Sequence, residues 1–231
     1  MVTLDDPQQI HHLRDVLRLG VGDQIMAFNG QGSQWLGTIV RVSARRVVIQ
    51  LEQQRDRPVE RAVSVWLGQA LLKADRFEWV IQKATELGVA TLSPLVTRHT
   101  VVRLSSEQAI TRRQRWQRIA TEAAKQCQRA TIPVIDPPQS LEAFLRRMQR
   151  PSLILIPTLS VTAIPLQEVL PARQAGREAV ALIGPEGDFS PEEVALAETF
   201  GARPVSLGPY TLRAETAAVA LLAILQHVLG S

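Results

Sequence analysis

Two loops in the last quarter of the chain carry the residues best suited to chemistry. The first, residues 184–189 (GPEGDF), follows an apolar run at residues 179–183 that is typical of a buried strand, and it leads into Ser190, a good helix N-cap. Glycine-bearing loops at the carboxyl ends of parallel strands are where open α/β sheets hold ligands. The loop lacks the Lys and Ser/Thr of a P-loop and the spacing of a dinucleotide-binding loop, and Glu186 and Asp188 would repel a pyrophosphate. We therefore expect a ligand with hydroxyls, an amine or a positive centre, with a plain strand-to-helix turn as the alternative.

The second loop has the same form. Residues 202–207 predict a short strand, and the segment that follows, GPYTLRAET, opens a helix that ends near Leu229. That helix is apolar nearly all round, which predicts burial in the domain or in a subunit interface. Glu215 suits a helix N-terminus electrostatically, and this accounts for it without any function. Arg213 gains nothing from the helix dipole, so a ligand or substrate role is more plausible for Arg213.

The basic residues are concentrated in the middle of the chain. Residues 98–150 hold 11 basic and 4 acidic residues, in a chain whose net charge is +4. Of the 26 basic residues only three are lysines. Because the guanidinium group suits bidentate phosphate contacts and stacking on bases, this segment favours a nucleic-acid partner. A solvated helix face combined with an arginine-rich genome is the alternative explanation.

Composition excludes several classes of protein. The chain has 231 residues, 45% of them hydrophobic and 21% charged, which is typical of a globular protein and not of a disordered or fibrous one. No apolar run approaches the roughly 18–20 residues needed to cross a bilayer, and the first residues do not resemble a signal peptide. One cysteine, Cys127, cannot form an internal disulfide, and four scattered histidines do not predict a metal site. We expect a cytoplasmic protein without a metal, with Cys127 on the buried stripe of a helix.

The pattern of elements divides the chain into two parts. Residues 20–67 predict short strands separated by turn residues, which is typical of a small barrel or sandwich. A polar stretch at residues 52–60 is the best candidate for a linker. From there on, strands alternate with helices, such as a helix over residues 74–87 and a long basic helix over 106–130, and this predicts a parallel α/β sheet. We place the domains at residues 1–60 and 61–231.

Five ordered motifs are together specific enough to indicate a family. They are HHLRDVLRLGVGD at 11–23, KATELGV at 83–89, RWQRIATEAAKQCQR at 115–129, LIGPEG at 182–187 and LG…LRAETA at 207–217. This set resembles the RsmE family, the 16S ribosomal RNA uracil-N3 methyltransferases of the SPOUT class. The resemblance implies an N-terminal PUA-like RNA-binding β-barrel and a C-terminal α/β methyltransferase domain with a trefoil knot. It also implies a homodimer that uses S-adenosylmethionine and acts on 16S ribosomal RNA of the small ribosomal subunit.

The resemblance also assigns roles to residues. For the cofactor pocket it implies Thr158, Gly184, Pro185, Glu186, Gly187, Leu207, Gly208, Leu212 and Arg213. An acidic loop tolerates a sulfonium cation where it would reject phosphate, which agrees with this assignment. For catalysis we expect Arg213 to orient the uracil and stabilise charge on its oxygens, with Glu215 as a weaker candidate for the base. The expected phosphate contacts are Arg98, Arg103, Arg112, Arg113 and Arg129.

The chain departs from the family pattern at three places. Asp188 stands where the family usually has glycine, and Tyr210-Thr211 stands where it usually has Arg-Ile. The family's first strand would precede Met1, so either the chain is truncated or its barrel is a shorter version without that strand. Two other functions remain as alternatives. A non-catalytic RNA-binding protein would keep the basic segment and fail to bind S-adenosylmethionine, and a nucleotide-dependent α/β enzyme would need a phosphate-binding loop that the sequence lacks.

Overall fold

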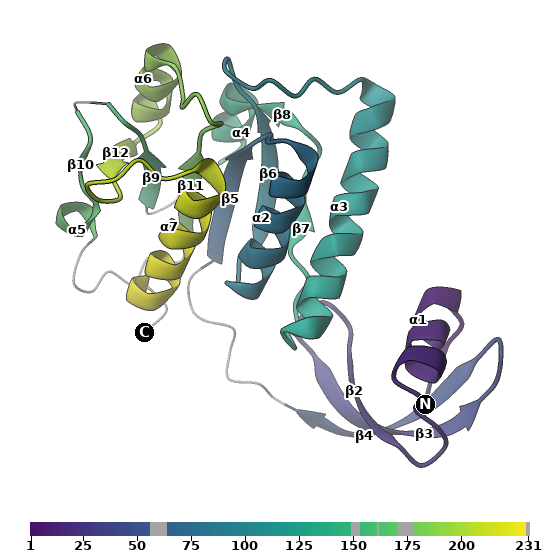
Figure 1. Cartoon of the computed structure of the whole chain (residues 1–231). Helices are drawn as coiled ribbons and strands as arrows, with labels where there is room; N and C mark the ends of the chain where they lie inside the picture. Colours follow the sequence, from purple (N-terminus) through teal and green to yellow (C-terminus); the bar gives the residue numbers. More distant parts are fainter. Residues whose placement is uncertain (56–63, 149–152, 161, 171–177, 230–231) are drawn as a thin grey trace. The chain divides into compact units, whose positions relative to one another are not determined.

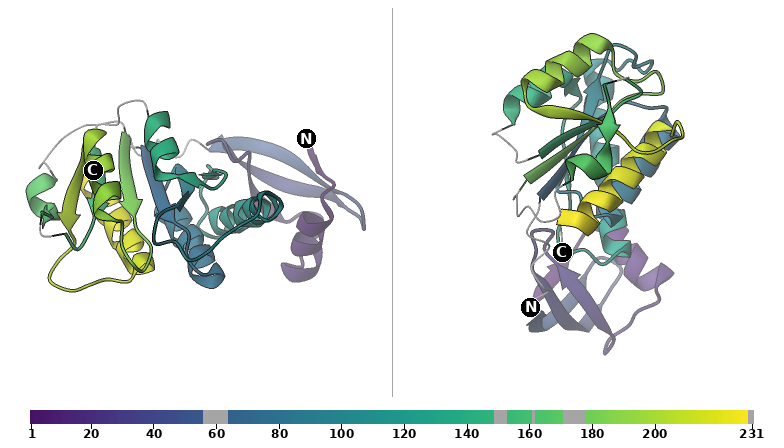
Figure 2. Two further views of the ribbon diagram at one scale, coloured as in Figure 1. Left: turned by 90° about the horizontal axis from the view of Figure 1, so that it is seen from above. Right: turned by 90° about the vertical axis from the view of Figure 1, so that its left-hand side faces the viewer.

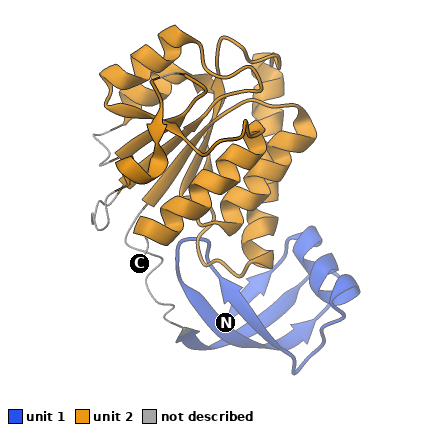
Figure 3. Ribbon diagram, turned by 60° about the vertical axis from the view of Figure 1, so that its left-hand side comes forward, with its two compact units in different colours: residues 1–60 blue, residues 61–231 orange. Residues whose placement is uncertain are grey.

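The structure is a computed structural model that describes residues 1–55, 64–148, 153–160, 162–170 and 178–229 (Figure 1). The chain divides into two compact units, residues 1–60 and residues 61–231 (Figure 3). No helix within the described ranges is long and apolar enough to cross a membrane. Each unit has a hydrophobic core of its own.

The N-terminal unit is a small antiparallel sheet with one helical segment. Its strands are β1 (Val2–Leu4), β2 (Gln24–Phe28), β3 (Gln34–Val42) and β4 (Val47–Arg55), in the order β1-β4-β3-β2. The order leaves β1 and β2 as the two edges among residues 1–55. Helix α1 (Pro7–His11) is capped by the Asp6 carboxylate and continues as the π-helical turn η1 (His12–Val16). The core is small because only four apolar side chains are buried in it: Ile10, Ile39, Val47 and Ile49.

The C-terminal unit is built on a parallel sheet. Its strand order is β10-β12-β9-β11-β5-β6-β7, with β8 also paired to β6, and every pair is parallel. The strands are β5 (Ser64–Ala70), β6 (Thr91–Val96), β7 (Val134–Ile135), β8 (Gln139–Ser140), β9 (Leu153–Pro157), β10 (Ile164–Pro165), β11 (Glu178–Ile183) and β12 (Ala202–Ser206). The parallel α/β sheet expected from the alternation of strands and helices is confirmed.

Helices cover both faces of this sheet (Figure 2). The helices are α2 (Ala74–Glu86), α3 (Ser106–Gln126), α4 (Leu141–Arg147), α5 (Leu166–Val169), α6 (Pro191–Thr199) and α7 (Ala214–Leu229). The central strand β11 shows why both faces need cover. Ala179, Ala181 and Ile183 pack in the same cluster as side chains of α2, α3, α5 and α7, whereas Val180 and Leu182 pack with α4 and α6. A strand buried on both faces reads as one continuous apolar run, as residues 179–183 do.

Local sequence accounts for the ends of the helices. Helix α2 ends where Gly88 takes a φ of +84°, a left-handed conformation that glycine adopts without strain. Helices α3 and α6 both begin with a complete capping box, formed by Ser105 with Gln108 and by Ser190 with Glu193. Helix α3 ends at Gln126, four residues before the end expected from the sequence. Cys127 caps that end half-buried, with its thiol 3.6 Å from the Ala124 carbonyl oxygen.

Candidate active site

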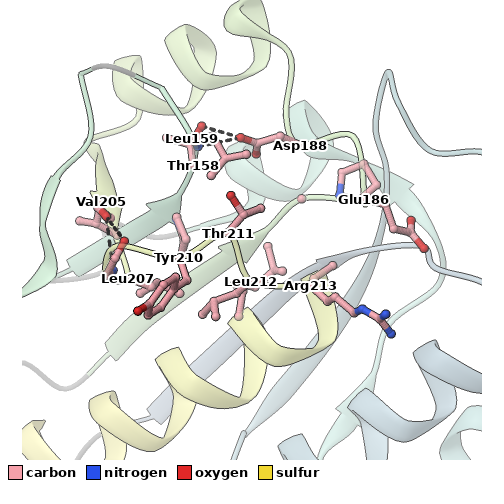
Figure 4. A pocket seen from close by; sticks show the side chains of 18 residues that line it. Thr158, Leu159, Glu186, Asp188, Val205, Leu207, Tyr210, Thr211, Leu212 and Arg213 are labelled. Atoms are coloured by element: carbon pink, nitrogen blue, oxygen red, sulfur yellow. Dashed lines mark hydrogen bonds between the residues drawn. The ribbon is translucent and has the colours of Figure 1, made fainter.

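A cavity of about 260 Å³ opens at the carboxyl ends of β9, β11 and β12 (Figure 4). Three segments contribute to its lining: residues 157–159 after β9, residues 183–186 and 188 after β11, and residues 205–208, 210–214 and 217 from the end of β12 into α7. Ligands of open α/β sheets bind at this edge because the connecting loops there leave the plane of the sheet. The cavity therefore lies where the sequence predicts a ligand site.

The loop after β11 is packed tightly against its surroundings. A methyl group on Gly184 would lie 3.1 Å from the Phe189 nitrogen and 3.2 Å from Asp188, so only glycine fits without movement. Asp188 has a φ of +58°, a conformation that a non-glycine residue adopts only when its surroundings hold it. Its carboxylate supplies that support, because it accepts hydrogen bonds from the Thr158 hydroxyl (2.9 Å), the Leu159 N–H (2.9 Å) and the Phe189 N–H (2.7 Å). Asp188 thus ties the loop after β11 to the loop after β9.

The segment that follows β6 also contacts the loop after β11 and the start of α6, through hydrogen bonds from His99 and Arg98. The Nδ1 atom of His99 lies 2.9 Å from the Gly187 carbonyl oxygen and 3.0 Å from that of Asp188. Because both partners are acceptors, Nδ1 carries the proton. The Arg98 N–H donates to the carboxylate of Glu193 (2.9 Å), the capping residue of α6. Hydrogen bonding from the Ser190 hydroxyl, followed by smaller contributions that include Arg98, lowers the pKa of the neighbouring Glu192.

The loop after β12 is much more open. Gly208 has a φ of +130°, and a methyl group placed on it would meet nothing within 4 Å. Tyr210, Thr211 and Arg213 are exposed, and no hydrogen bond or ion pair links their side chains to the other described residues. The one side-chain anchor of this turn is the Ser206 hydroxyl, which donates to the Gly208 carbonyl oxygen at 3.1 Å. The side chains of this loop are therefore available to a ligand.

A charged cluster lies beside the cavity and joins three elements. Arg76, in the first turn of α2, contacts the Glu186 carboxylate at 3.1 Å. Its Nε atom lies 3.8 Å from one oxygen of Glu215, in the first turn of α7. The other oxygen of Glu215 is buried and has no hydrogen-bond partner among the described residues. Arg76 was not expected from the sequence.

Most residues predicted for the cofactor pocket come together in this cavity. Thr158, Gly184, Pro185, Glu186, Leu207, Gly208, Leu212 and Arg213 all line it. Gly187 does not: its carbonyl group binds His99 on the far side of the loop. Glu215 does not line the cavity either, because its carboxylate faces Arg76. The geometry therefore favours an anchoring role for Glu215 over the role of base.

The arginines predicted to bind RNA fall into different environments. Arg103 is exposed and Arg112 half-buried, and neither has a partner within the described ranges. Arg98 pairs with Glu192 at 3.0 Å, and the Arg113 Nε donates to the Ile135 carbonyl oxygen. Arg129 is the most engaged of the five within the protein. Its guanidinium donates to the carbonyl oxygens of Thr85 and Val89, both at 2.9 Å, and to the Thr131 hydroxyl, so Arg129 serves the fold.

Comparison with known proteins places the chain in a family. Residues 59–226 match the model of an RNA methyltransferase domain, and residues 4–52 match that of an RNA methyltransferase PUA domain. The ribosomal RNA small subunit methyltransferase E of Synechocystis sp. is 34% identical over 96% of this chain and 72% of that protein. This chain belongs to the RsmE family of RNA methyltransferases. The protein of the same name from Bacillus subtilis is 28% identical over 95% of this chain and 88% of its own length.

Solved structures of RsmE-type proteins have the same fold. A Legionella pneumophila protein described as a methyltransferase, with the cofactor SAM bound, is 34% identical and superposes with a TM-score of 0.88 over 98% of this chain and 91% of its own. The ribosomal RNA small subunit methyltransferase E of Neisseria gonorrhoeae, bound to S-adenosyl methionine, is 28% identical with a TM-score of 0.87, over 97% of this chain and 90% of its own. The predicted fold class, a PUA domain followed by an α/β methyltransferase domain, is thus confirmed. The trefoil knot stays a prediction.

Proposed function

We propose that this chain transfers a methyl group from S-adenosylmethionine to N3 of a uridine in the 16S RNA of the small ribosomal subunit. Membership of the RsmE family and the cavity at the carboxyl ends of β9, β11 and β12 support the proposal together. The observation that carries the proposal is that the cofactor residues implied by the family lie in this cavity. Eight of the nine residues that the family resemblance implies for the cofactor line that one cavity, although they come from three separate segments.

The lining of the cavity fits S-adenosylmethionine better than a nucleotide phosphate. Arg213 is its only basic residue, and Glu186 and Asp188 are acidic, so the site suits a sulfonium cation and would repel a di- or triphosphate. The apolar part of the lining, which suits an adenosine, consists of Pro157, Leu159, Ile183, Pro185, Val205, Leu207, Leu212, Ala214 and Ala217. Gly184 lets the loop fold tightly against this lining, because the space that a Cβ would need is filled by Phe189 and Asp188. When bound, S-adenosylmethionine supplies a methyl group activated by its sulfonium centre.

Arg213 has the position and the freedom to act on the uracil. Its side chain is exposed and lines the cavity, and no carboxylate of the described residues is paired with it. The methyl group passes to N3 of uracil as its bond to the sulfonium sulfur breaks, which leaves the cofactor as a thioether. N3 must first give up its proton, to a base or to water, and the resulting anion carries negative charge on the two neighbouring oxygens. A guanidinium group stabilises such charge through charge-assisted hydrogen bonds, which neutral donors do less well. Arg213 would orient the uracil in the same way.

The basic segment would hold the RNA backbone. Arg103 and Arg112 are the best candidates for contacts with RNA phosphates, because neither side chain has a protein partner in the described part of the chain. For single-stranded RNA, log K falls with log salt by about 0.7 for each phosphate contact. Loss of one contact in Arg103→Ala should reduce the steepness of the salt dependence by about that amount. An unchanged slope in both Arg103→Ala and Arg112→Ala would remove these residues from the RNA contact.

The proposal includes a homodimer, which rests on the family resemblance, and a cytoplasmic location, which is expected from the sequence. Light scattering of the purified protein measures the first directly. A monomer that is fully active would contradict the dimer.

Calorimetric titration with S-adenosylmethionine tests the proposed function. The parent protein should bind the cofactor, and Gly184→Trp should abolish binding, because a side chain at position 184 must displace Phe189 and Asp188 and so disrupts the loop that lines the cavity. Gly20→Trp is the matched control: it adds the same side chain in the N-terminal unit, where a Cβ would meet only Asp23, at 4.0 Å. Thermal unfolding shows whether each variant is folded. A parent protein that binds RNA but no S-adenosylmethionine would instead support the non-catalytic RNA-binding alternative.

The target is tested separately. Small ribosomal subunits that lack the modification, incubated with the protein and labelled cofactor, should gain one methyl group on a uridine. Mass spectrometry of nuclease digests distinguishes 3-methyluridine from its isomers. Methylation of another base or another atom would leave the cofactor site intact and overturn the choice of N3.

A further inference from the structure

Tyr210 is an aromatic side chain that the fold does not use. It is 80% exposed, and among the described residues no other aromatic side chain is more than 42% exposed. It is also the only tyrosine of the chain. Neither its ring nor its hydroxyl has a partner within the described ranges. A ring this exposed buries little apolar surface against the domain, so it is free to contact a ligand.

The other large aromatic residues show the contrast. Phe77 and Trp116 are buried and pack against each other with ring centroids 4.7 Å apart. Phe144 and Phe189 are buried in the second core cluster of the same unit. Trp66 lies beneath the guanidinium of Arg147 at 5.4 Å. Each of these rings has neighbours in the fold, whereas Tyr210 extends from an open loop.

Tyr210 nevertheless lines the cavity (Figure 4). It lies on the same loop as Arg213, and the two side chains extend from opposite ends of one short turn. Val205, Leu207 and Leu212 add apolar side chains to the lining of the cavity on the same segment. A flat ring and a free guanidinium beside one cavity are the two groups by which proteins most often recognise an unstacked base.

We propose that Tyr210 stacks on the target uracil while Arg213 binds the edge of the same base. This inference rests on the proposed function, because it names the contact that would hold the nucleotide at the site. The ring is a contact for the incoming base and not for the adenine of the cofactor, since it lies in the exposed part of the lining. A small cofactor in a cleft buries most of its surface, and the RNA must approach from solvent. A base that leaves its own stack regains stacking energy on the ring.

Steady-state kinetics on unmodified small subunits test the stacking contact. Loss of base–aromatic stacking costs roughly tenfold to a hundredfold in affinity, so Tyr210→Ala should raise KM for the subunit by about that factor. Tyr210→Phe keeps the ring and should stay within about twofold of the parent protein, because stacking does not need the hydroxyl. The Kd for S-adenosylmethionine should be the same in all three proteins. Phe200→Ala, which removes a 36% exposed ring that does not line the cavity, is the matched control.

A spectroscopic test follows from the single tyrosine. Protein grown with 3-fluorotyrosine carries one fluorine label, at position 210, and gives one ¹⁹F resonance. An RNA hexamer with one uridine, added to the protein saturated with cofactor, should shift that resonance. A hexamer with an abasic site in place of the uridine should shift it less. A resonance that moves with the cofactor alone and not with the RNA would assign the ring to the cofactor and overturn the inference.

The outcomes separate this inference from the proposed function. If the parent protein neither binds S-adenosylmethionine nor methylates the subunit, the proposed function fails. If the parent is active and Tyr210→Ala has the same KM, kcat and cofactor affinity, only the stacking role fails. Equal loss of activity in Tyr210→Phe and Tyr210→Ala would also contradict stacking, because it would point to the hydroxyl group.

Discussion

The two loops that enclose the cavity differ in how firmly the protein holds them. The loop after β11 is fixed by three hydrogen bonds to the Asp188 carboxylate, two contacts from His99 and the ion pair of Arg76 with Glu186. In the loop after β12 the only side-chain hydrogen bonds among the described residues are the two between the Ser206 hydroxyl and Gly208, and the side chains of Tyr210, Thr211 and Arg213 are exposed. Both loops follow parallel strands and both precede a helix, so the difference comes from side chains and not from topology.

This difference suggests that the two loops have different roles in one site: the fixed loop binds the cofactor and the open loop binds the RNA. A preformed wall loses little conformational entropy when a ligand binds, which suits a small cofactor that needs a defined pocket. An open wall can adjust to a macromolecular substrate, and it keeps Tyr210 and Arg213 available until the RNA arrives. The two walls should therefore respond differently to substitution: the fixed loop through cofactor affinity and the open loop through turnover and RNA affinity.

Arg213→Ala should have the largest effect, and on the open loop. Removing a group that stabilises developing charge costs on the order of a hundredfold in kcat, so we expect a fall of about that size at saturating cofactor. Arg213→Lys keeps the charge without the planar fork and should recover part of the loss. Single-turnover methylation of small subunits measures the effect. Normal turnover in Arg213→Ala would show that the open loop does not take part in the chemistry.

Asp188→Ala should have the next largest effect, and on cofactor affinity. It removes three hydrogen bonds and places alanine at a φ of +58°, so we expect about tenfold weaker binding of S-adenosylmethionine. Asp188→Gly also loses the hydrogen bonds but accepts the backbone conformation, so its melting temperature should exceed that of Asp188→Ala. Calorimetry and thermal unfolding give the two values. A tenfold loss of kcat with unchanged cofactor affinity would contradict the assignment of cofactor binding to the fixed loop.

His99→Ala should weaken cofactor binding by about fivefold, the equivalent of roughly one net hydrogen bond. The substitution frees the carbonyl groups of Gly187 and Asp188, which lie on the side of the loop away from the cavity. His227→Ala, a substitution in the last turn of α7, is a control that leaves this loop untouched. Equal cofactor affinity in His99→Ala and the parent protein would mean that Asp188 alone fixes the loop.

Arg76→Ala should have the smallest effect. The side chains of Arg76 and its partner Glu186 are 39% and 43% exposed. Because exposed ion pairs contribute little, we expect about a twofold loss of cofactor affinity. Arg115→Ala is the matched control, because Arg115 binds Glu78 on the same helix α2 away from the cavity. A larger loss in Arg76→Ala than in Asp188→Ala would make the charged cluster, and not Asp188, the main support of the fixed loop.

The sequence predicts the positions of both loops because each is a contiguous motif after an apolar strand. It does not predict what holds them, since His99 and Arg76 reach the site from other elements and belong to common residue types. For Arg76 the sequence does contain a signal of a functional role. A cation in the first turn of a helix interacts unfavourably with the helix dipole, and the same argument singled out Arg213. For His99 the sequence offers no comparable signal.

Charge counting also has a limit that Arg129 illustrates. In the sequence it belongs to the basic segment, and nothing separates it from Arg103 or Arg112. In the structure its guanidinium binds the carbonyl oxygens of Thr85 and Val89, near the end of α2. A count of arginines states how much positive charge a segment has, but tertiary packing decides which of these side chains remain available to RNA.

The sheet order has a consequence for how this site can be moved between proteins. All the residues that line the cavity lie between positions 157 and 217, about a quarter of the chain. Strand β11, however, pairs along its full length with β5, from Ser64 to Gln69, and α7 packs against α2. An excised segment that contains every lining residue would expose the edge of β11 and the apolar face of α7. The site is thus compact in sequence and yet not a transplantable module, because the strand that carries its fixed loop is completed by residues encoded more than a hundred positions earlier.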